Sequence, residues 1–278
     1  MKTQADKAHA FRALHERAGA FIIPNPWDVG SARILAQLGF EALATTSAGA
    51  AFSAGRRDGG IVRDAMLAHV AAIVEATDLP VSADLESGYA QGPTGVAETF
   101  RLAAAAGVVG ASIEDASGDP AHPLRDIEPA TERVRAAVEA VRALPFPFTV
   151  TARAENFLVG RCDLGDTITR LQAYQNAGAD VLYAPGLVDA NDIATVVRAV
   201  DRPVNVVMGL AGSQLDLVTL AKLGVKRVSV GSALARAAFG ALIRAAHEMR
   251  ERGTFAFADH AVAYRDLGAM FETAAERG

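Results

Sequence analysis

The chain has 278 residues, of which 51% are hydrophobic, and its 27 Lys and Arg against 32 Asp and Glu give a net charge of −5. This is ample apolar material for a core, but no apolar run approaches the roughly 20 residues that span a bilayer. The basic residues are scattered, which argues against a nucleic-acid footprint and against a polybasic membrane surface. We therefore expect a small-molecule ligand, with neither nucleic acid nor a membrane as partner.

The N-terminal segment MKTQADKAHAFRALHERAG is charged throughout and lacks the apolar core of a signal peptide. We expect it to form a first helix. The single cysteine, Cys162, excludes an intrachain disulfide and a cysteine-based metal cluster. Together these features predict a cytoplasmic protein.

Short apolar runs rich in β-branched residues recur along the chain with helical stretches between them, which predicts parallel strands joined by crossover helices. Several runs are apolar throughout, as is typical of strands covered on both faces. The eight predicted strands are Ala20–Pro24, Ala42–Thr46, Val81–Asp84, Gly110–Glu114, Phe148–Arg153, Val181–Ala184, Val204–Met208 and Arg227–Gly231.

Helical stretches lie between these strands, and several end at a glycine suited to a helix C-terminus, namely Gly39, Gly107, Gly178 and Gly224. Eight such units without a composition break favour a single α/β domain over residues 1–278, folded as a (β/α)8 barrel. A doubly wound open sheet is the alternative. The predicted helices are Asp28–Leu38, Arg63–Ala76, Thr94–Ala106, Glu128–Ala143 and Asp166–Ala177.

A C-terminal helical extension follows the last strand over residues 233–278. It contains two predicted helices, Ala233–Arg252 and Ala258–Ala275. The first completes the eighth unit of the barrel. The second is surplus to the barrel, and we expect it to pack on the barrel or on a neighbouring subunit.

Acidic side chains gather at the ends of two neighbouring strands. Asp84 and Glu86 follow the third strand, and residues i and i+2 of an extended segment point to the same side; Glu114 ends the fourth strand. Three crowded carboxylates are costly unless protons or a cation neutralise them, and an all-oxygen set favours Mg²⁺, with Mn²⁺ as the alternative. Solvated loop acids and helix caps are the competing interpretation.

Arg153 ends an otherwise apolar strand, where a guanidinium would be buried unless it pairs with an acid such as Glu155 or with a ligand carboxylate. The second strand leads into a stretch of small residues, Thr45, Thr46, Ser47, Ala48 and Gly49, whose backbone N–H groups could approach an anion closely. An ordinary strand-to-loop turn is the alternative.

Four motifs in chain order resemble the isocitrate lyase/phosphoenolpyruvate mutase superfamily between about Phe11 and Gly240. They are PNPWDVGSARILAQLGFEALATTSAG, ADLESGY, IEDAS and TARAEN. The resemblance implies a (β/α)8 barrel whose extra C-terminal helix is swapped between subunits of a homodimer or homotetramer.

The resemblance also implies site residues. Mg²⁺ would bind at Asp84, with Glu86 and Glu114 acting largely through water and Asp58 nearby. Thr45, the Ser47–Gly49 backbone (Ser47, Ala48 and Gly49), Arg153 and Asn205 would bind the substrate, and Arg153 and Glu114 would also take part in catalysis.

Departures from the family pattern limit which of the family's reactions we expect this chain to catalyse. The segment Ala116–Glu128 corresponds to a lid, yet it contains neither the cysteine of the lyases nor the lysine and asparagine of the phosphonopyruvate-forming mutases. The residues that do match the family would still bind a metal ion and a small 2-oxo carboxylate, and would stabilise the enolate formed from it. Tyr89, His122 or water would then donate a proton, although a plain surface histidine is the preferred interpretation of His122.

We therefore predict an enzyme, a Mg²⁺-dependent carbon–carbon lyase or decarboxylase acting on an oxaloacetate-like 2-oxo acid. Two alternatives stay open. One is P–C bond chemistry, as a mutase or hydrolase, on phosphonopyruvate or a carboxyphosphonate. The other is a barrel that binds a 2-oxo acid without catalysis.

Overall fold

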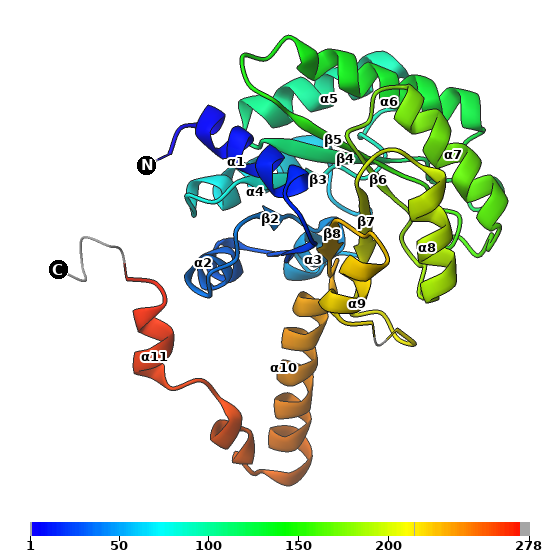
Figure 1. Ribbon diagram of the computed structural model, residues 1–278. Helices are drawn as coiled ribbons and strands as arrows, with labels where there is room; N and C mark the ends of the chain where they lie inside the picture. The colour runs from blue at the N-terminus through cyan, green and yellow to red at the C-terminus, as the bar shows by residue number, and fades with distance from the viewer. Residues whose placement is uncertain (1, 214, 273–278) are drawn as a thin grey trace.

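Eight parallel strands form a nearly closed barrel in the computed structural model, which describes residues 2–213 and 215–272 (Figure 1). The strand order is β1-β8-β7-β6-β5-β4-β3-β2. The two end strands of this order meet where the Ala44 N–H donates to the Pro24 carbonyl at 3.1 Å. The strands are β1 (Phe21–Ile23), β2 (Leu43–Ala44), β3 (Val81–Asp84), β4 (Gly110–Glu114), β5 (Thr149–Arg153), β6 (Val181–Tyr183), β7 (Val204–Val207) and β8 (Arg227–Ser229). The predicted barrel is therefore confirmed, and the alternative of a doubly wound open sheet is wrong.

Helices surround the barrel and alternate with its strands (Figure 1). Their apolar faces pack on the outer side of the strands, and the largest buried cluster lies between these two layers. The helices around the barrel are α2 (Val29–Gln37), α3 (Ser47–Ser53), α4 (Arg63–Glu75), α5 (Pro93–Ala105), α6 (Ile127–Arg142), α7 (Leu164–Asn176), α8 (Ala190–Ala199) and α9 (Leu217–Lys222).

The predicted strands and long helices are confirmed, with every observed strand lying inside its predicted range. The cap glycines are confirmed as well. Gly178 has φ 101°, and a Cβ there would lie 2.6 Å from Nη2 of Arg142. The positive φ strains any residue with a side chain and so favours glycine, and this helix ends where the pattern predicted. Helices α3 and α8 were not predicted, and α9 was predicted only through Gly224, the cap glycine that follows it.

The first helix, α1 (Gln4–Glu16), packs against the beginnings of the strands. Phe11 and Leu14 form a second buried cluster with Phe21 and Ile23 of β1. Because α1 covers the N-terminal ends of the strands, the opposite end, where the strands finish, is the one available for a site.

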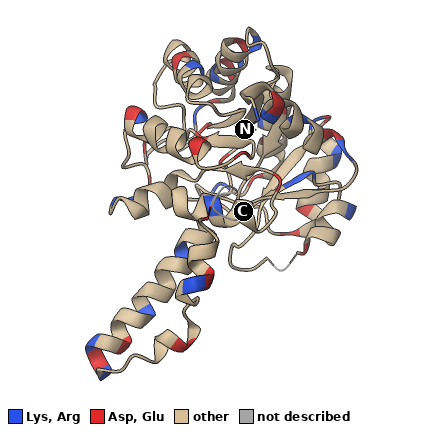
Figure 2. Cartoon of the chain, turned by 90° about the vertical axis from the view of Figure 1, so that its left-hand side faces the viewer, with Lys and Arg blue, Asp and Glu red and all other residues tan. Residues whose placement is uncertain are grey.

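The last part of the described chain forms an arm that projects from the barrel in both views (Figures 1 and 2). Its long helix is α10 (Ala233–Arg252), as predicted. The single helix predicted over 258–275 is wrong: a 3-10 turn, η1 (Ala256–His260), precedes the short helix α11 (Tyr264–Ala269), and residues 273–275 lie outside the described residues. No residue of η1 or α11 is buried, so tertiary packing does not stabilise a longer helix.

No helix in the described part of the chain combines the length and the apolar character needed to cross a bilayer.

Candidate active site

A pocket of about 270 Å³ opens where the strands end. Its walls combine polar groups from strands β3 to β8 with the small residues that follow β2. This volume is below the range of roughly 300–1,000 Å³ for drug-sized ligands, so the pocket suits a small metabolite. The residues that line this pocket include Thr45, Ser47, Ala48, Asp58, Asp84, Ser112, Arg153, Tyr183, Asn205, Arg227, Ser229 and Arg236.

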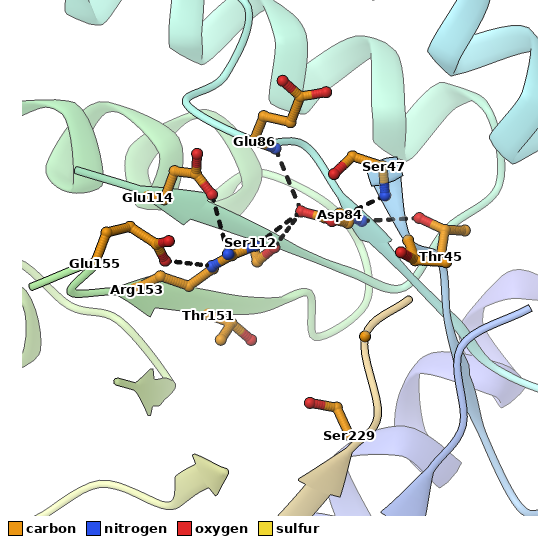
Figure 3. Close-up of polar contacts among 12 residues, drawn as sticks. Thr45, Ser47, Asp84, Glu86, Ser112, Glu114, Thr151, Arg153, Glu155 and Ser229 are labelled. Atoms are coloured by element: carbon orange, nitrogen blue, oxygen red, sulfur yellow. Dashed lines mark hydrogen bonds and ion pairs between the residues drawn. The ribbon is translucent and has the colours of Figure 1, made fainter. Parts of the chain in front are cut away.

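Arg153 binds three carboxylates at once (Figure 3). Its Nη1 lies 3.1 Å from Oδ1 of Asp84, its Nη2 lies 3.2 Å from Oε2 of Glu114, and its Nε donates to Oε1 of Glu155 at 2.8 Å. Its guanidinium also lies 5.3 Å from the centre of the Tyr183 ring. The prediction that the buried Arg153 pairs with an acid is therefore confirmed. Its partners are the predicted Glu155 and, in addition, Asp84 and Glu114.

Asp84 is held from the neighbouring strand as well as by Arg153. Its Oδ2 accepts from the backbone N–H of Ser47 at 3.0 Å, while its own N–H donates to Oγ1 of Thr45 at 2.9 Å. The Ser112 hydroxyl lies 3.4 Å from Oδ1. These contacts orient the carboxylate into the pocket with little freedom to turn.

Negative charge exceeds positive charge around Arg153. Burial raises the pKa of Glu114, Glu86 and Asp58, and the neighbouring Asp84 raises each of these pKa values further. Burial also raises the pKa of Glu155, although Arg153 opposes that shift. Arg153 alone therefore does not favour the ionised form of all these carboxyl groups, and a second cation beside them would.

The carboxylates lie in one region of the structure, but they are not arranged to coordinate a metal ion directly. Among residues 2–213 and 215–272, no three His, Cys, Asp or Glu side chains are arranged to hold a metal ion directly. The donor chemistry nevertheless fits a hard divalent cation, because the donors are carboxylate oxygens and a bound cation would oppose the burial that raises their pKa values. Asp84 is the carboxylate of the predicted metal set that faces the pocket from a strand end, and Asp58 lies on the exposed rim.

The loop after β3 has an unusual backbone that places Glu86. Glu86 and Tyr89 have φ of 49° and 53°, in the left-handed region that is uncommon for residues with a side chain. The Tyr89 hydroxyl donates to Oε1 of Glu86 at 2.8 Å. The buried guanidinium of Arg133 donates to the carbonyls of Ser87 and Gln91, and so fixes both ends of the loop.

A buried network supports the site from behind. Asp115 is 2% exposed and accepts from Nη1 of Arg170 at 3.0 Å, from the Tyr174 hydroxyl at 2.6 Å and from the Glu155 N–H at 2.9 Å. The third of these contacts connects the network to the partner of Arg153. Packing of α7 is thereby coupled to the position of Glu155.

The small residues after β2 form the start of a helix. Thr46 caps α3 by accepting from the Gly49 N–H at 3.2 Å, and the Ser47 N–H is occupied by Asp84. A Cβ on Gly49 would lie 2.6 Å from Cγ2 of Thr46, so close packing requires glycine there. Ser47 and Ala48 line the pocket, whereas the Gly49 N–H faces Thr46.

Two of the predicted site residues, Asn205 and His122, lie in different parts of the structure. Asn205 lines the pocket floor, where its amide donates to the Ser229 hydroxyl at 3.0 Å. His122 lies on the surface, with its side chain 83% exposed and its Nδ1 3.3 Å from Asp119. It lines a separate surface hollow beside Gln91 and not the pocket of Asp84.

Three pocket residues were not assigned a role from sequence. Tyr183 lines the pocket from β6, and burial raises its pKa to about 12. Arg227 lies inside the barrel on β8, and Arg236 lies on the first turn of α10. Arg227 could have been recognised from the sequence, because it is a guanidinium on an otherwise apolar strand, as Arg153 is.

The geometry defines a (β/α)8-barrel protein with a carboxylate-rich pocket at the strand ends. The chain matches the family described as "Phosphoenolpyruvate phosphomutase" over residues 11–250. It is therefore a member of the phosphoenolpyruvate mutase/isocitrate lyase superfamily, whose members are lyases and mutases.

Individual relatives agree with this assignment. A crystal structure described as a putative lyase/mutase from Burkholderia cenocepacia J2315 is 64% identical, with a TM-score of 0.95, and the match covers 98% of this chain and 97% of that one. The uncharacterized protein Rv1998c of Mycobacterium tuberculosis is 34% identical, over 80% of this chain and 82% of the relative. An oxaloacetate decarboxylase of Chromohalobacter salexigens is 30% identical, over 90% of this chain and 87% of the relative.

Proposed function

We propose that the protein is a Mg²⁺-dependent carbon–carbon lyase or decarboxylase acting on an oxaloacetate-like 2-oxo acid in the cytoplasm. The observation that carries the proposal is the group of carboxylates around Arg153, with Asp84 directed into a small polar pocket. The similarity to an oxaloacetate decarboxylase supports the same substrate class.

A divalent cation bound by Asp84, with Glu86, Glu114 and Asp58 around it, would supply an electrophile for the keto and carboxylate oxygens of the substrate. Arg153 keeps Asp84 and Glu114 in place through the contacts given above. The small residues Ser47 and Ala48 leave room for a carboxylate beside Asp84.

Tyr183 is the best-placed proton donor. Its pKa of about 12 keeps the phenol protonated at neutral pH, and it lines the pocket, whereas the predicted donors Tyr89 and His122 do not. Tyr89 donates its proton to Glu86, and the surface position of His122 would require the loop to move before it could reach a substrate.

The deciding experiment follows oxaloacetate by NMR with Mg²⁺, against a blank without enzyme because the metal alone decarboxylates this compound. We expect turnover that EDTA abolishes and that Asp84→Asn lowers at least about a hundredfold. Asp119→Asn, which makes the same charge change on the exposed loop, should behave as wild type. Turnover unaffected by both EDTA and Asp84→Asn would refute the proposal.

Phosphonopyruvate is the second candidate substrate, because the matching family is described as a phosphomutase. Phosphorus NMR in the same assay distinguishes the two. A new phosphorus signal, with oxaloacetate unchanged, would favour P–C chemistry.

We also propose that a second copy of the chain covers the arm and makes a homodimer or homotetramer. Leu242 and Ile243 of α10 are 61% and 56% exposed, and Phe255 beyond it is 65% exposed. Large apolar side chains gathered on a projecting arm are typical of an interface.

For this interface we expect Leu242→Glu to reduce the molar mass measured by light scattering to that of a smaller assembly, because a charge cannot be buried there without a partner. Arg250→Glu, at an exposed arginine of the same helix, is the control. A wild-type protein that elutes as a monomer would contradict the proposal.

A further inference from the structure

Arg133, on the side of α6 that faces the loop after β3, is a buried arginine without an acid partner. It is 2% exposed, and no acidic side chain among residues 2–213 and 215–272 forms an ion pair with it. Burial and the neighbouring Arg125 lower its pKa to about 10, so the guanidinium is still charged at neutral pH. A buried charge without a counter-ion is costly, and such violations of the usual rules are concentrated at functional sites.

The donors of Arg133 are directed at a single loop. Its Nη1 donates to the Gln91 carbonyl at 2.5 Å, and its Nη2 donates to the Ser87 carbonyl. These two carbonyls lie on either side of Tyr89, whose φ of 53° is in the left-handed region. A residue with a side chain keeps such a conformation only where the surrounding contacts hold it. Arg133 supplies those contacts on both sides of Tyr89.

Tyr89 in turn holds the carboxylate of Glu86. Its hydroxyl donates to Oε1 of Glu86 at 2.8 Å, and within the described part of the chain this is the one hydrogen bond that the carboxylate accepts. Figure 3 shows the Glu86 side chain turned away from Arg153, so the guanidinium that holds the other carboxylates does not hold this one. The orientation of Glu86 therefore depends on where Tyr89 lies.

We infer that Arg133 is a positioning residue for the metal site: by fixing residues 87–91, it places the Tyr89 hydroxyl so that the Glu86 carboxylate keeps the orientation used to bind the cation. The inference rests on the proposed function, in which Glu86 lies around a cation bound by Asp84. Removing a group that orients a metal ligand typically changes metal affinity by about 10–100-fold. Replacing Arg133 should therefore weaken Mg²⁺ binding, although this residue does not line the pocket.

Calorimetric titration with Mg²⁺ tests the inference without relying on turnover. We expect Arg133→Met, which has no hydrogen-bond donor, to weaken Mg²⁺ binding about tenfold, and Tyr89→Phe to weaken it by a similar factor. The double variant should bind no more weakly than the weaker single variant, because both changes act through the same hydrogen bond to Glu86. Independent effects would multiply instead, to about a hundredfold.

Two variants of α6 are matched controls. Arg135→Met makes the same change of charge at an exposed position, and Val134→Ala removes buried apolar volume from the same turn of the helix. Both should bind Mg²⁺ as the wild type does, even though Val134→Ala lowers stability. In turnover assays the Arg133→Met defect should shrink as Mg²⁺ approaches saturation, which a merely structural defect would not do.

Arg133→Lys keeps the charge but replaces the planar fork with a single nitrogen, so it should bind Mg²⁺ with intermediate affinity. This variant carries the test if Arg133→Met does not fold. Wild-type affinity in the folded Arg133 variants, multiplying effects in the double variant, or equal weakening in Val134→Ala overturns the inference alone. A wild-type protein that binds no Mg²⁺ overturns the proposed function together with it.

Discussion

Replacing Arg153 with methionine should abolish activity and lower the free energy of unfolding by about 3–5 kcal/mol at neutral pH, the usual cost of breaking a buried ion pair from one side. Three carboxylates lose their shared counter-ion in this variant, namely Asp84, Glu114 and Glu155. Arg153→Lys should recover only part of the stability, because one ammonium group cannot reproduce the planar fork that reaches all three.

The loss of stability in Arg153→Met should be larger at high pH than at low pH. Burial already raises the pKa of Glu114 and Glu155 above the usual 4.5, and removing the guanidinium raises both pKa values further. A carboxylate with a raised pKa in the folded state stabilises the fold below its unfolded pKa, and that stability is lost as pH rises through the folded pKa.

Urea unfolding at about pH 5 and about pH 8 should therefore give a small deficit at the lower pH and a large one at the higher pH. Arg101→Met, at an exposed arginine with a 3.3 Å surface pair to Glu98, is the control and should cost less than about 1 kcal/mol. A deficit that is equal at both pH values would show that lost packing, rather than uncompensated charge, causes the effect.

Replacing Asp115 with alanine should destabilise the protein by about 3–5 kcal/mol, although this residue does not line the pocket. The variant leaves the Tyr174 hydroxyl and the Glu155 N–H without their acceptor. It also removes one of the two acid partners that the buried Arg170 guanidinium has among the described residues, and leaves it Asp166 at 2.8 Å. Because Glu155 holds Arg153, we also expect activity to fall while the pocket residues themselves are unchanged.

The contributions within this network can be separated. Tyr174→Phe removes one donor and leaves Asp115 paired with Arg170, so it should cost about 1–2 kcal/mol. Asp78→Ala, at an exposed position between α4 and β3, should change the free energy of unfolding by no more than about 0.5 kcal/mol. An Asp115→Ala protein as stable as wild type would refute the role assigned to the network.

The strands and the acidic strand ends could be predicted because their signal is local. A strand covered on both faces must be apolar, so a carboxylate or guanidinium at its end, such as Asp84 or Arg153, stands out from the run before it. Helix α3 has only seven residues and carries little periodic signal, which is why it was not predicted.

Partner choice could not be predicted in the same way. Glu155 was the nearest candidate in sequence for Arg153, yet Asp84 and Glu114 also reach it, because β3, β4 and β5 are adjacent in the barrel. These partners are not encoded in the spacing of residues along the chain. His122, by contrast, lies on the surface, as the preferred interpretation of the sequence had it.

By itself, the sequence determined the succession of strands and helices and the kinds of side chain presented at the strand ends, since both depend on local burial and periodicity. Only the tertiary structure decided which charges meet. Closing the barrel brings Asp84, Glu114 and Glu155 around one guanidinium and leaves Arg227 and Arg236 without acid partners in the described part of the chain. Electrostatic energy depends on distance and burial, and both are set by contacts between residues far apart in sequence.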